Sequence, residues 1–461
     1  MATLETRDAD YGKKVLAVEP GGIEAIPEQD RHGKAWSLFA LWTSPNLEFA
    51  TIYVGALGVF FGLSLTKAIL GVLLGNALGA ISQYFLTKDG PRYGVPQMVV
   101  SRAAFGRYGN VLPSLFNALA SGIGWFAVNS VSGMYALSSL THMGQFEALI
   151  IIAAVQVGIA VIGHNLIQTI EKYLMPYLLV VFTITAIIVF TKHHVAHPEQ
   201  WGLPGSFTLF VGAVFGYAAG WNPFASDYSR YLPSSTKPQA AGGYAALGLF
   251  IYPSLIQIAG VAAVFVGMHD YGSGNPVSDF TSYLPHWFGY FLTAGIVLGS
   301  VCANVLNIYS GAMSFVTMGL KLPINYVRAG VAVSFGIAGF FVANYARTNP
   351  ANSIENFLLV MAYWIGPWLG VIFADKVLRR GGSISHLLFA KRENYAGPIA
   401  FVTGVVVSML LFSNQTWYTG YFPKRHPGIG DIGFPVGFAI AFIVYAVIAT
   451  LTKSTKDSSA Q

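Results

Sequence analysis

Charged side chains are scarce in this 461-residue sequence, in which Asp, Glu, Lys and Arg make up 10% of the residues. A soluble domain of ordinary composition carries about 25% of these residues, most of them on its surface. The apolar fraction is 54% and the mean hydropathy is +0.56. This composition excludes an ordinary soluble enzyme and a disordered chain, and it indicates a polytopic membrane protein.

Other absences exclude classes of function. The single cysteine, Cys302, excludes a disulfide framework and a multi-cysteine metal site. The sequence contains no glycine–lysine nucleotide motif, so ATP is not expected to drive its activity. The net charge is +6, but the basic residues fall in short loops, so no nucleic-acid partner is expected. A membrane enzyme would need clustered catalytic groups and a channel would need a polar filter; neither pattern is present.

Twelve apolar segments are long enough to cross a bilayer core about 30 Å thick. They are 37–62, 67–86, 111–140, 147–163, 173–191, 206–225, 243–267, 288–316, 324–345, 354–374, 396–412 and 433–451. The fourth and fifth are separated because Gly163 to Asn165, and then Glu171 and Lys172, interrupt the apolar pattern. The first 35 residues lack a basic start followed by an apolar core, which predicts a flexible cytoplasmic tail rather than a signal peptide.

The distribution of Lys and Arg orients these segments. With the N-terminus inside, the cytoplasmic segments hold 21 of the 26 basic residues and the external segments hold five. The positive-inside rule therefore predicts a multi-pass protein of the cell membrane with both termini in the cytoplasm. Three external histidines, His193, His194 and His197, are expected to be solvated, so no metal site is predicted.

Two segments contain helix-breaking residues near their middles, at 41–48 (LWTSPNLE) and 216–223 (GYAAGWNP). In hydrocarbon, such a break is tolerated only where it lines a cavity enclosed by protein. Each is the first segment in a run of five, which predicts two inverted repeats with a binding site near the midplane. The alternative is that both breaks are packing kinks. Gly71, Gly75 and Gly79 form a stripe that favours close helix packing.

Four motifs carry a resemblance to a known family. The segments 90–110, 122–129, 221–233 and 303–310 resemble motifs of the nucleobase:cation symporter-1 family, of the purine–cytosine permease type. The resemblance extends from about 36 to 452. It implies an all-α integral membrane fold of twelve transmembrane helices, a LeuT-type 5+5 inverted repeat with broken helices 1 and 6. The transport core would be 36–378, followed by helices 11 and 12 in 379–452 and a cytoplasmic tail in 453–461.

The resemblance also implies a site for a planar ring. Such a ring needs flat faces above and below and a few in-plane hydrogen-bonding groups. Trp125 and Trp221 match the tryptophans that sandwich the base in the family. Asn129 lies one helical turn after Trp125 and faces the same cavity, and its amide can both donate and accept. The family's hydantoin transporter has glutamine here, so the shorter asparagine suits a larger base. Asn304 matches a ligand-binding asparagine of the eighth span.

The residues beside the two breaks are further candidates. Ser44 and Asn46 flank the first break and would supply polar contacts, and Gly220 lies where the second break frees backbone groups for a ligand. Asn307, one turn after Asn304, is expected to bond to its neighbours or to pack between helices. Asp227 and Arg230, at the cytoplasmic end of span 6, would either form an inner gate or stabilise the loop.

The coupling ion follows from two observations. In sodium-coupled relatives, two hydroxyls of span 8 bind Na⁺, but their positions here fall on Leu298 and Gly299, with Ser300 adjacent. Sodium needs hard oxygen ligands, so this departure argues against a sodium site. Glu48 is an acidic residue in mid-membrane, where carboxyl groups commonly belong to proton relays, although it could instead bond to the broken backbone.

The sequence therefore predicts a monomeric, non-enzymatic importer of cytosine, purines or both, working by alternating access. It would need no cofactor beyond a coupling ion, more readily H⁺ than Na⁺, and its partners would be a small ring compound and membrane lipid. The alternatives are another ring substrate (allantoin, hydantoin, uracil or a vitamin) or coupling to Na⁺.

Overall fold

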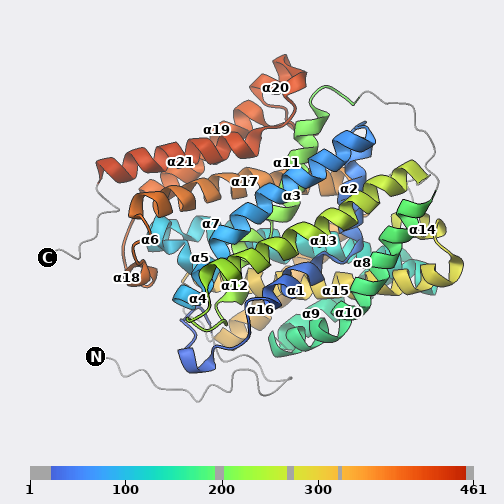
Figure 1. Cartoon of the computed structure of the whole chain (residues 1–461), viewed down its shortest axis with the longest axis horizontal. Helices are drawn as coiled ribbons and strands as arrows, with labels where there is room; N and C mark the ends of the chain where they lie inside the picture. The colour runs from blue at the N-terminus through green and yellow to red at the C-terminus, as the bar shows by residue number, and fades with distance from the viewer. Residues whose placement is uncertain (1–21, 163, 193–201, 267–274, 320–323, 453–461) are drawn as a thin grey trace.

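The computed structural model describes residues 22–162, 164–192, 202–266, 275–319 and 324–452. Within these ranges the regular structure is helical (Figure 1). The helices of the first half are α1 (Ser37–Thr43), α2 (Phe49–Phe60), α3 (Leu65–Thr87), α4 (Asp89–Tyr93), α5 (Gln97–Val100), α6 (Arg102–Gly109), α7 (Val111–Leu119), α8 (Phe126–Thr141), α9 (Gln145–Ile162) and α10 (His164–Thr191). Those of the second half are α11 (Ser206–Ala219), α12 (Ala225–Ser229), α13 (Pro238–Val266), α14 (Pro276–Ser282), α15 (His286–Thr317), α16 (Ile324–Ala346), α17 (Pro350–Arg379), α18 (Ser385–Leu388), α19 (Ala396–Phe412), α20 (Tyr421–Arg425) and α21 (Gly433–Leu451).

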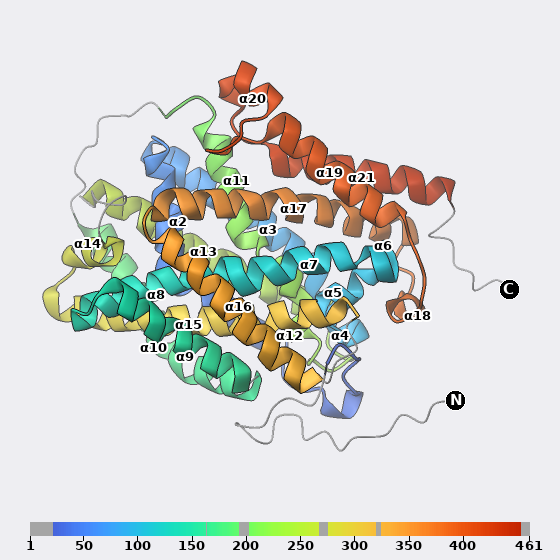
Figure 2. The same cartoon turned by 180° about the vertical axis from the view of Figure 1, so that it is seen from behind.

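The long helices run in similar directions, with the short helices gathered at their ends. Figures 1 and 2 show α19 and α21 beside α17 on one side of the molecule, and α9 and α10 on the other. The short helices α4, α5, α6 and α18 lie at one end and α14 lies at the opposite end. The first group belongs to the segments expected in the cytoplasm, so this end is called the inner end below.

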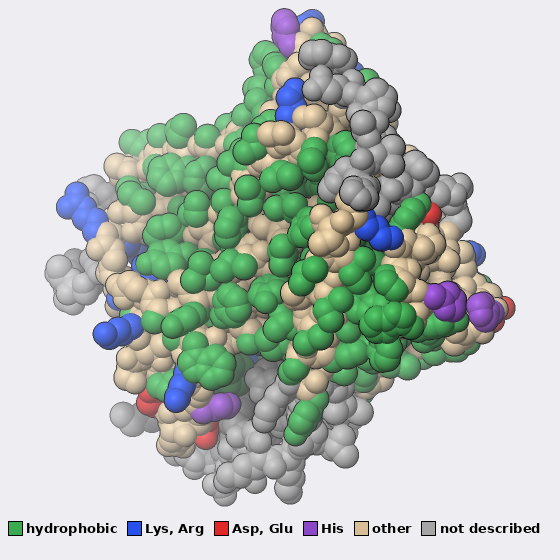
Figure 3. Space-filling model, turned by 45° about the vertical axis from the view of Figure 1, so that its right-hand side comes forward, with side chains coloured by type: hydrophobic (Ala, Val, Ile, Leu, Met, Phe, Trp, Pro, Cys, Tyr) green, Lys and Arg blue, Asp and Glu red, His purple; other side chains and the backbone are tan. Residues whose placement is uncertain are grey.

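The outer surface suits a lipid solvent. Seven described helices are long and apolar enough to cross a membrane. Figure 3 shows hydrophobic side chains over the middle of one face and most charged side chains toward its edges. Such an arrangement matches a hydrocarbon core bounded by polar interfaces.

The α-helices are interrupted at the two segments rich in Pro, Gly and Asn. Helix α1 ends at Thr43, a 3₁₀ turn covers Ser44–Asn46, and α2 begins at Phe49 after Glu48 in extended backbone (φ −150°, ψ 169°). Helix α11 ends at Ala219, and a second 3₁₀ turn at Asn222–Phe224 precedes α12. Each turn carries a proline in its first two positions, where the missing N–H costs nothing.

The glycine stripe of α3 packs closely against α11, as its spacing predicts. A Cβ atom added at Gly71, Gly75 or Gly79 would lie 2.6 Å from an atom of Phe210, Val214 or Ala218, respectively. Both sets repeat every four residues, so the side chains on one face of α11 pack directly on the glycine face of α3.

Two expectations need correction. Glu171 and Lys172 do not interrupt the fifth span, because α10 continues through them from His164 to Thr191. The second part of the N-terminal segment is not a loose tail, since Ile26 N donates to Gly94 O, and His32 N donates to Tyr231 O. Both contacts join this segment to the inner end of the helices.

Side-chain contacts hold the same N-terminal segment. Arg31 donates to the carbonyl of Pro91 at 2.8 Å. Glu28 accepts hydrogen bonds from the backbone N–H and the hydroxyl of Ser234. These bonds, with a smaller contribution from Arg31, hold the pKa of Glu28 below its usual value.

The packing of α3 on α11 predicts that a large side chain destabilises the fold at Gly75 but not at Gly243. Gly75→Leu is expected to destabilise the fold by about 1–3 kcal/mol or more, because its side chain would overlap Val214. The measurement is the midpoint of thermal aggregation in detergent. Gly243→Leu on α13 is the matched control, since no atom lies within 4 Å of its added Cβ. Equal midpoints for the two variants would contradict this packing.

Candidate functional site

The two 3₁₀ turns meet in the interior through Trp221 and Asn46. Trp221 Nε1 donates to Asn46 Oδ1 at 3.1 Å, and Asn46 Nδ2 donates to the carbonyl of Trp42 at 2.8 Å. The rings of Trp42 and Trp221 lie 5.9 Å apart in an edge-to-face arrangement. Trp221 is 5% exposed, so its ring is part of the interior rather than of an interfacial belt.

Trp125 reaches the second turn from the other side. It ends a π-helical turn at Ala120–Trp125 between α7 and α8, a feature often found at functional sites. A Cβ at Gly220 would lie 3.0 Å from the Trp125 ring, so the absence of a side chain lets the indole pack closely on this backbone. The Trp125 ring also contacts Tyr217 and Phe357, edge to face, at 5.6 and 5.0 Å. Trp125 therefore approaches the break between α11 and α12 that contains Trp221.

Asn304 of α15 is held in one orientation by neighbours on α8 and α9. Its Nδ2 donates to the Phe126 carbonyl at 2.9 Å, to Ser130 Oγ at 3.2 Å and to Gln156 Oε1 at 2.9 Å. Gln156 in turn accepts from Ser130 at 2.8 Å and donates to the Ser300 carbonyl at 3.1 Å. With its nitrogen engaged in this way, Asn304 presents its oxygen toward Asn129.

The amide of Asn129 lies between Asn304 and Glu48. In one orientation its nitrogen donates to Asn304 Oδ1 at 3.0 Å. With the amide turned over, the nitrogen donates to both Glu48 carboxyl oxygens at 3.2 Å, and the oxygen accepts from Asn307 Nδ2 at 3.2 Å. Asn129 is therefore the junction between the carboxyl group and the other amides.

Glu48 is the acidic group of this centre and is 2% exposed. None of the ion pairs among the described residues includes it. It precedes the first turn of α2, where the helix dipole favours negative charge. A carboxylate enclosed in this way without a cation is costly, so the site needs a positive charge or a proton.

Hydroxyl groups fix the backbone beside this carboxyl group. Thr51 Oγ1 donates to the Asn46 carbonyl at 2.7 Å, and the hydroxyls of Thr51 and Tyr217 lie 2.5 Å apart. This chain of contacts ties the first turn to α11. Two buried oxygens near this centre, Ser44 Oγ and Asn307 Oδ1, have no hydrogen-bond partner in the described part of the chain. Unpaired buried oxygens of this kind can accept from a ligand or a water.

Two cavities approach the centre from opposite ends. The inner one has a volume of about 470 Å³ and is lined by Ser44, Tyr228 and Gly33, among others. The outer one, about 40 Å³, is lined by Phe49 and Val128, the neighbours of Glu48 and Asn129 in the chain. The candidate residues thus lie between a wide inner cavity and a narrow outer one.

The position expected for sodium ligands carries no side-chain oxygen. A Cβ added at Gly299 would lie 2.6 Å from the Leu47 carbonyl, so this glycine faces the first turn directly. Ser300 instead donates to the Val297 carbonyl of its own helix at 2.8 Å.

Asp227 and Arg230 bond to different partners at the inner end. Asp227 accepts from the backbone N–H of Gln97 at 2.8 Å. Arg230 donates to the Gly22 carbonyl at 3.0 Å and to Tyr309 at 3.3 Å. These contacts fit the loop-stabilising alternative and also link α12 to the N-terminal segment.

Sequence reasoning missed Gln156, Ser130, Thr51 and Tyr217. Gln156 gave a usable signal, because a lone amide inside an apolar span must find a polar partner. The residues that the structure describes contain no group of three or more His, Cys, Asp or Glu side chains suited to a metal. His193, His194 and His197 lie outside the described residues.

Comparisons with known proteins agree along nearly the whole chain. A family described as permeases for cytosine/purines, uracil, thiamine and allantoin matches residues 25–437. The purine-cytosine permease fcyB of Emericella nidulans is 28% identical over 474 residues, covering 96% of this chain and 91% of the relative. The purine-cytosine permease FCY2 of Saccharomyces cerevisiae is 26% identical over 470 residues, covering 95% and 86%.

A solved structure has the same fold. It is that of Mhp1, a nucleobase-cation-symport-1 family transporter, in a closed conformation with bromovinylhydantoin bound. The TM-score is 0.72 at 18% identity, and the match covers 96% of this chain and 98% of the other. At this identity the likeness establishes the fold and leaves the ligand to be argued from the residues.

The hydrogen-bond network of Gln156 predicts a measurable cost of removing it. Gln156→Leu keeps the side-chain volume but removes the partner of Ser130 and Asn304, which should destabilise the fold by about 1–3 kcal/mol. We expect a lower midpoint of thermal unfolding in detergent. Gln239→Leu, at an exposed position, is the control and should leave the midpoint unchanged. A Gln156→Leu midpoint equal to that of the wild type would show that the network does not hold Asn304.

Proposed function

This chain belongs to the family of permeases for cytosine and purines, uracil, thiamine and allantoin, and on that premise we propose that it imports cytosine, purines or both together with protons. The observation that carries this proposal is the buried centre in which Trp125 and Trp221 flank one unwound turn beside the amides of Asn129 and Asn304. The names of its relatives favour a nucleobase as the substrate.

The chemistry of this centre suits a neutral, flat ring. Two indole rings offer apolar faces, and two carboxamides offer in-plane donors and acceptors that match the amide and imine edges of a base. Ser44 and Asn307 add unpaired oxygens that can accept from ring N–H groups. A charged substrate would need a counter-ion in the centre. The acidic group of the centre, Glu48, could serve as counter-ion to a cationic substrate but not to an anionic one.

Proton coupling is supported by the surroundings of Glu48. Gly299, opposite the Leu47 carbonyl, carries no side-chain oxygen, so the position expected to supply Na⁺ ligands from α15 has no hard donor. A buried carboxyl group without a cation partner is instead neutralised by a proton. We therefore assign the coupling role to Glu48.

The Asn129 amide provides a physical link between proton and substrate. When its nitrogen faces Asn304, its oxygen lies 3.2 Å from the Glu48 oxygens, a contact that is favourable only if the carboxyl group holds a proton. When Glu48 is charged, the amide turns over and donates to it, and Asn304 loses that donor. Protonation of Glu48 thus sets which way the amide nitrogen and oxygen of Asn129 point, and therefore which of them a ring would meet.

The two cavities support the proposal of alternating access. The wide inner cavity at Ser44 and the narrow outer cavity at Phe49 and Val128 approach one centre. A relative rotation of the helices around this centre would open one cavity as the other closes. We further propose twelve membrane spans in two inverted repeats of five plus two, a transport core at 36–378, cytoplasmic termini and a monomer.

Uptake of radiolabelled ring compounds tests this function. Proteoliposomes containing the full chain are expected to accumulate cytosine or a purine when an inward proton gradient is imposed without Na⁺. Uracil, allantoin and a hydantoin serve as alternative substrates in parallel assays. Accumulation of one of these alternatives without cytosine or a purine, or accumulation of no ring compound at all, would contradict the assignment to cytosine and purines. A strict requirement for Na⁺ would contradict proton coupling.

Trp221 tests the site within the same assay. Trp221→Ala removes an aromatic face worth about 1–3 kcal/mol of stacking on a base, so cytosine or purine affinity should fall roughly 5- to 150-fold. The control is Trp287→Ala, which removes an indole that is 66% exposed on the outer part of α15. Equal affinities of the two variants would remove Trp221 from the site.

Glu48 tests the coupling. Wild-type uptake should increase as the external pH falls, because protons then bind Glu48 from outside and are released inside. Glu48→Gln cannot exchange a proton, so the variant should equilibrate its substrate without accumulation and lose the pH dependence. Glu147→Gln, at an exposed position of α9, should retain the wild-type profile. An unchanged profile in Glu48→Gln would assign coupling to another group.

A further inference from the structure

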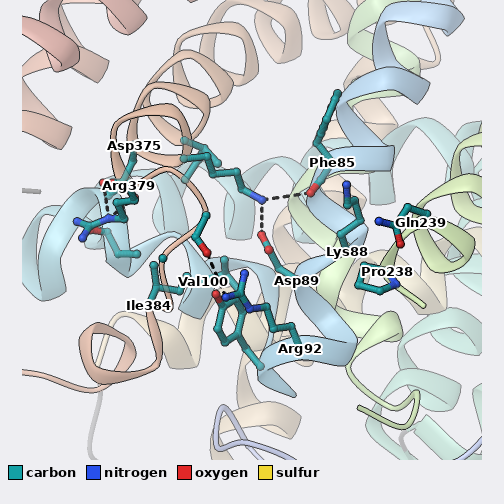
Figure 4. Close-up of a pocket in the computed structure, with 17 residues that line it drawn as sticks. Phe85, Lys88, Asp89, Arg92, Val100, Pro238, Gln239, Asp375, Arg379 and Ile384 are labelled. Carbon is teal, nitrogen blue, oxygen red and sulfur yellow. Dashed lines mark hydrogen bonds and ion pairs between the residues drawn. The ribbon is translucent and has the colours of Figure 1, made fainter. Parts of the chain in front are cut away.

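A third cavity, which shares no lining residue with the two described above, lies at the inner end between α3, α4, α13 and α17. Its volume is about 330 Å³, at the lower end of the range for small-molecule sites. Four basic side chains line it: Lys88, Arg92, Lys376 and Arg379. Figure 4 shows Lys88, Asp89 and Arg92 on one side and Asp375 and Arg379 on the other.

Only part of this positive charge is balanced. Lys376 Nζ pairs with Asp89 at 2.5 Å, and Arg379 Nε pairs with Asp375 at 2.8 Å. The two carboxylates of the cavity are thereby matched to two of its cations. The ion pairs among the described residues include neither Lys88 nor Arg92, so the cavity has an excess of positive charge.

The contacts of Lys88 and Arg92 orient these cations without neutralising them. Lys88 Nζ lies 4.7 Å from the centre of the Tyr84 ring. Arg92 donates to the Gly381 carbonyl at 3.2 Å. A carbonyl and a ring hold a cation in place, but both leave its charge available to an anion.

The cavity continues into a lipid-facing apolar surface. On α3, Ile81 and Phe85 are 55% and 45% exposed, and Lys88 follows Phe85 one turn later on the same helical face. On the adjacent α13, Tyr244 and Leu247 are 41% and 48% exposed. The basic cavity thus lies at the end of two apolar helix faces, where a bilayer has its headgroups.

We propose that this cavity binds the phosphate ester of an anionic phospholipid, with the acyl chains lying along α3 and α13. Phosphate is matched to paired Lys and Arg donors, and basic pockets between helices on the cytoplasmic side are suited to anionic headgroups. The apolar faces beside the cavity favour a lipid over a soluble phosphate. The proposal requires only that the helices lie in a bilayer, so it is independent of the transported substrate.

Native mass spectrometry of the purified full chain tests the site. The protein is titrated with dioleoyl phosphatidylglycerol and, separately, with neutral dioleoyl phosphatidylcholine. The wild type should bind the anionic lipid preferentially, and the double variant Lys88→Gln/Arg92→Gln should bind it about thirtyfold more weakly, the loss expected for two cations near a membrane surface. The double variant Arg107→Gln/Lys391→Gln has the same change of charge at residues that do not line the cavity, and it should bind as the wild type does.

Competition experiments distinguish a lipid headgroup from a soluble phosphate as the ligand. Millimolar inorganic phosphate or glycerol phosphate should not displace the lipid, and displacement at these concentrations would identify a soluble anion as the ligand and overturn the lipid assignment. Equal binding of the two lipids by the wild type, or equal loss in both double variants, would also overturn it.

Discussion

The burial of one carboxyl group, Glu48, is the constraint on which the arrangement of the centre depends. A charge enclosed by helices in hydrocarbon must be matched by a cation, a proton or directed hydrogen bonds. Its neighbours supply an amide that can turn over, Asn129, and the N-terminus of α2. The amides of α15 and the hydroxyls of α2 and α11 then hold the surrounding groups in fixed positions. The unwound turns can persist here because this network encloses them.

Close helix packing gives the centre its walls. Gly71, Gly75 and Gly79 allow α3 to approach α11, and Gly220 allows the Trp125 ring to reach the second turn. Glycine therefore has two roles here: it lets two helices pack closely, and it lets an aromatic ring contact the backbone. At the inner end, the basic cavity at Lys88 and Arg92 lies beside exposed apolar helix faces. The two proposals therefore assign a neutral ring to the amides and a lipid headgroup to the cations.

Much of this could be predicted from the sequence because hydrocarbon imposes simple rules. The membrane class and the family were predicted correctly, and the predicted segment 396–412 coincides with α19. The division into a fourth and a fifth span agrees with α9 and α10, but the start of the fifth at 173 was wrong, because α10 continues through the polar pair Glu171 and Lys172. Gln156 and Tyr217 were missed because their partners are distant in the chain, and no periodicity encodes which buried polar groups meet. The contacts that hold residues 22–36 against the inner end were missed for the same reason.

The most direct test of the central claim is the number of protons taken up when the purified wild-type protein binds cytosine or a purine. Isothermal titration calorimetry in two buffers of different ionisation enthalpy, without Na⁺, gives this number from the difference in observed heat. The account predicts net uptake of up to one proton per molecule bound, falling toward zero at acidic pH as Glu48 becomes protonated before the ring binds. Binding with no proton uptake at any pH, or binding that occurs only with Na⁺, would contradict it.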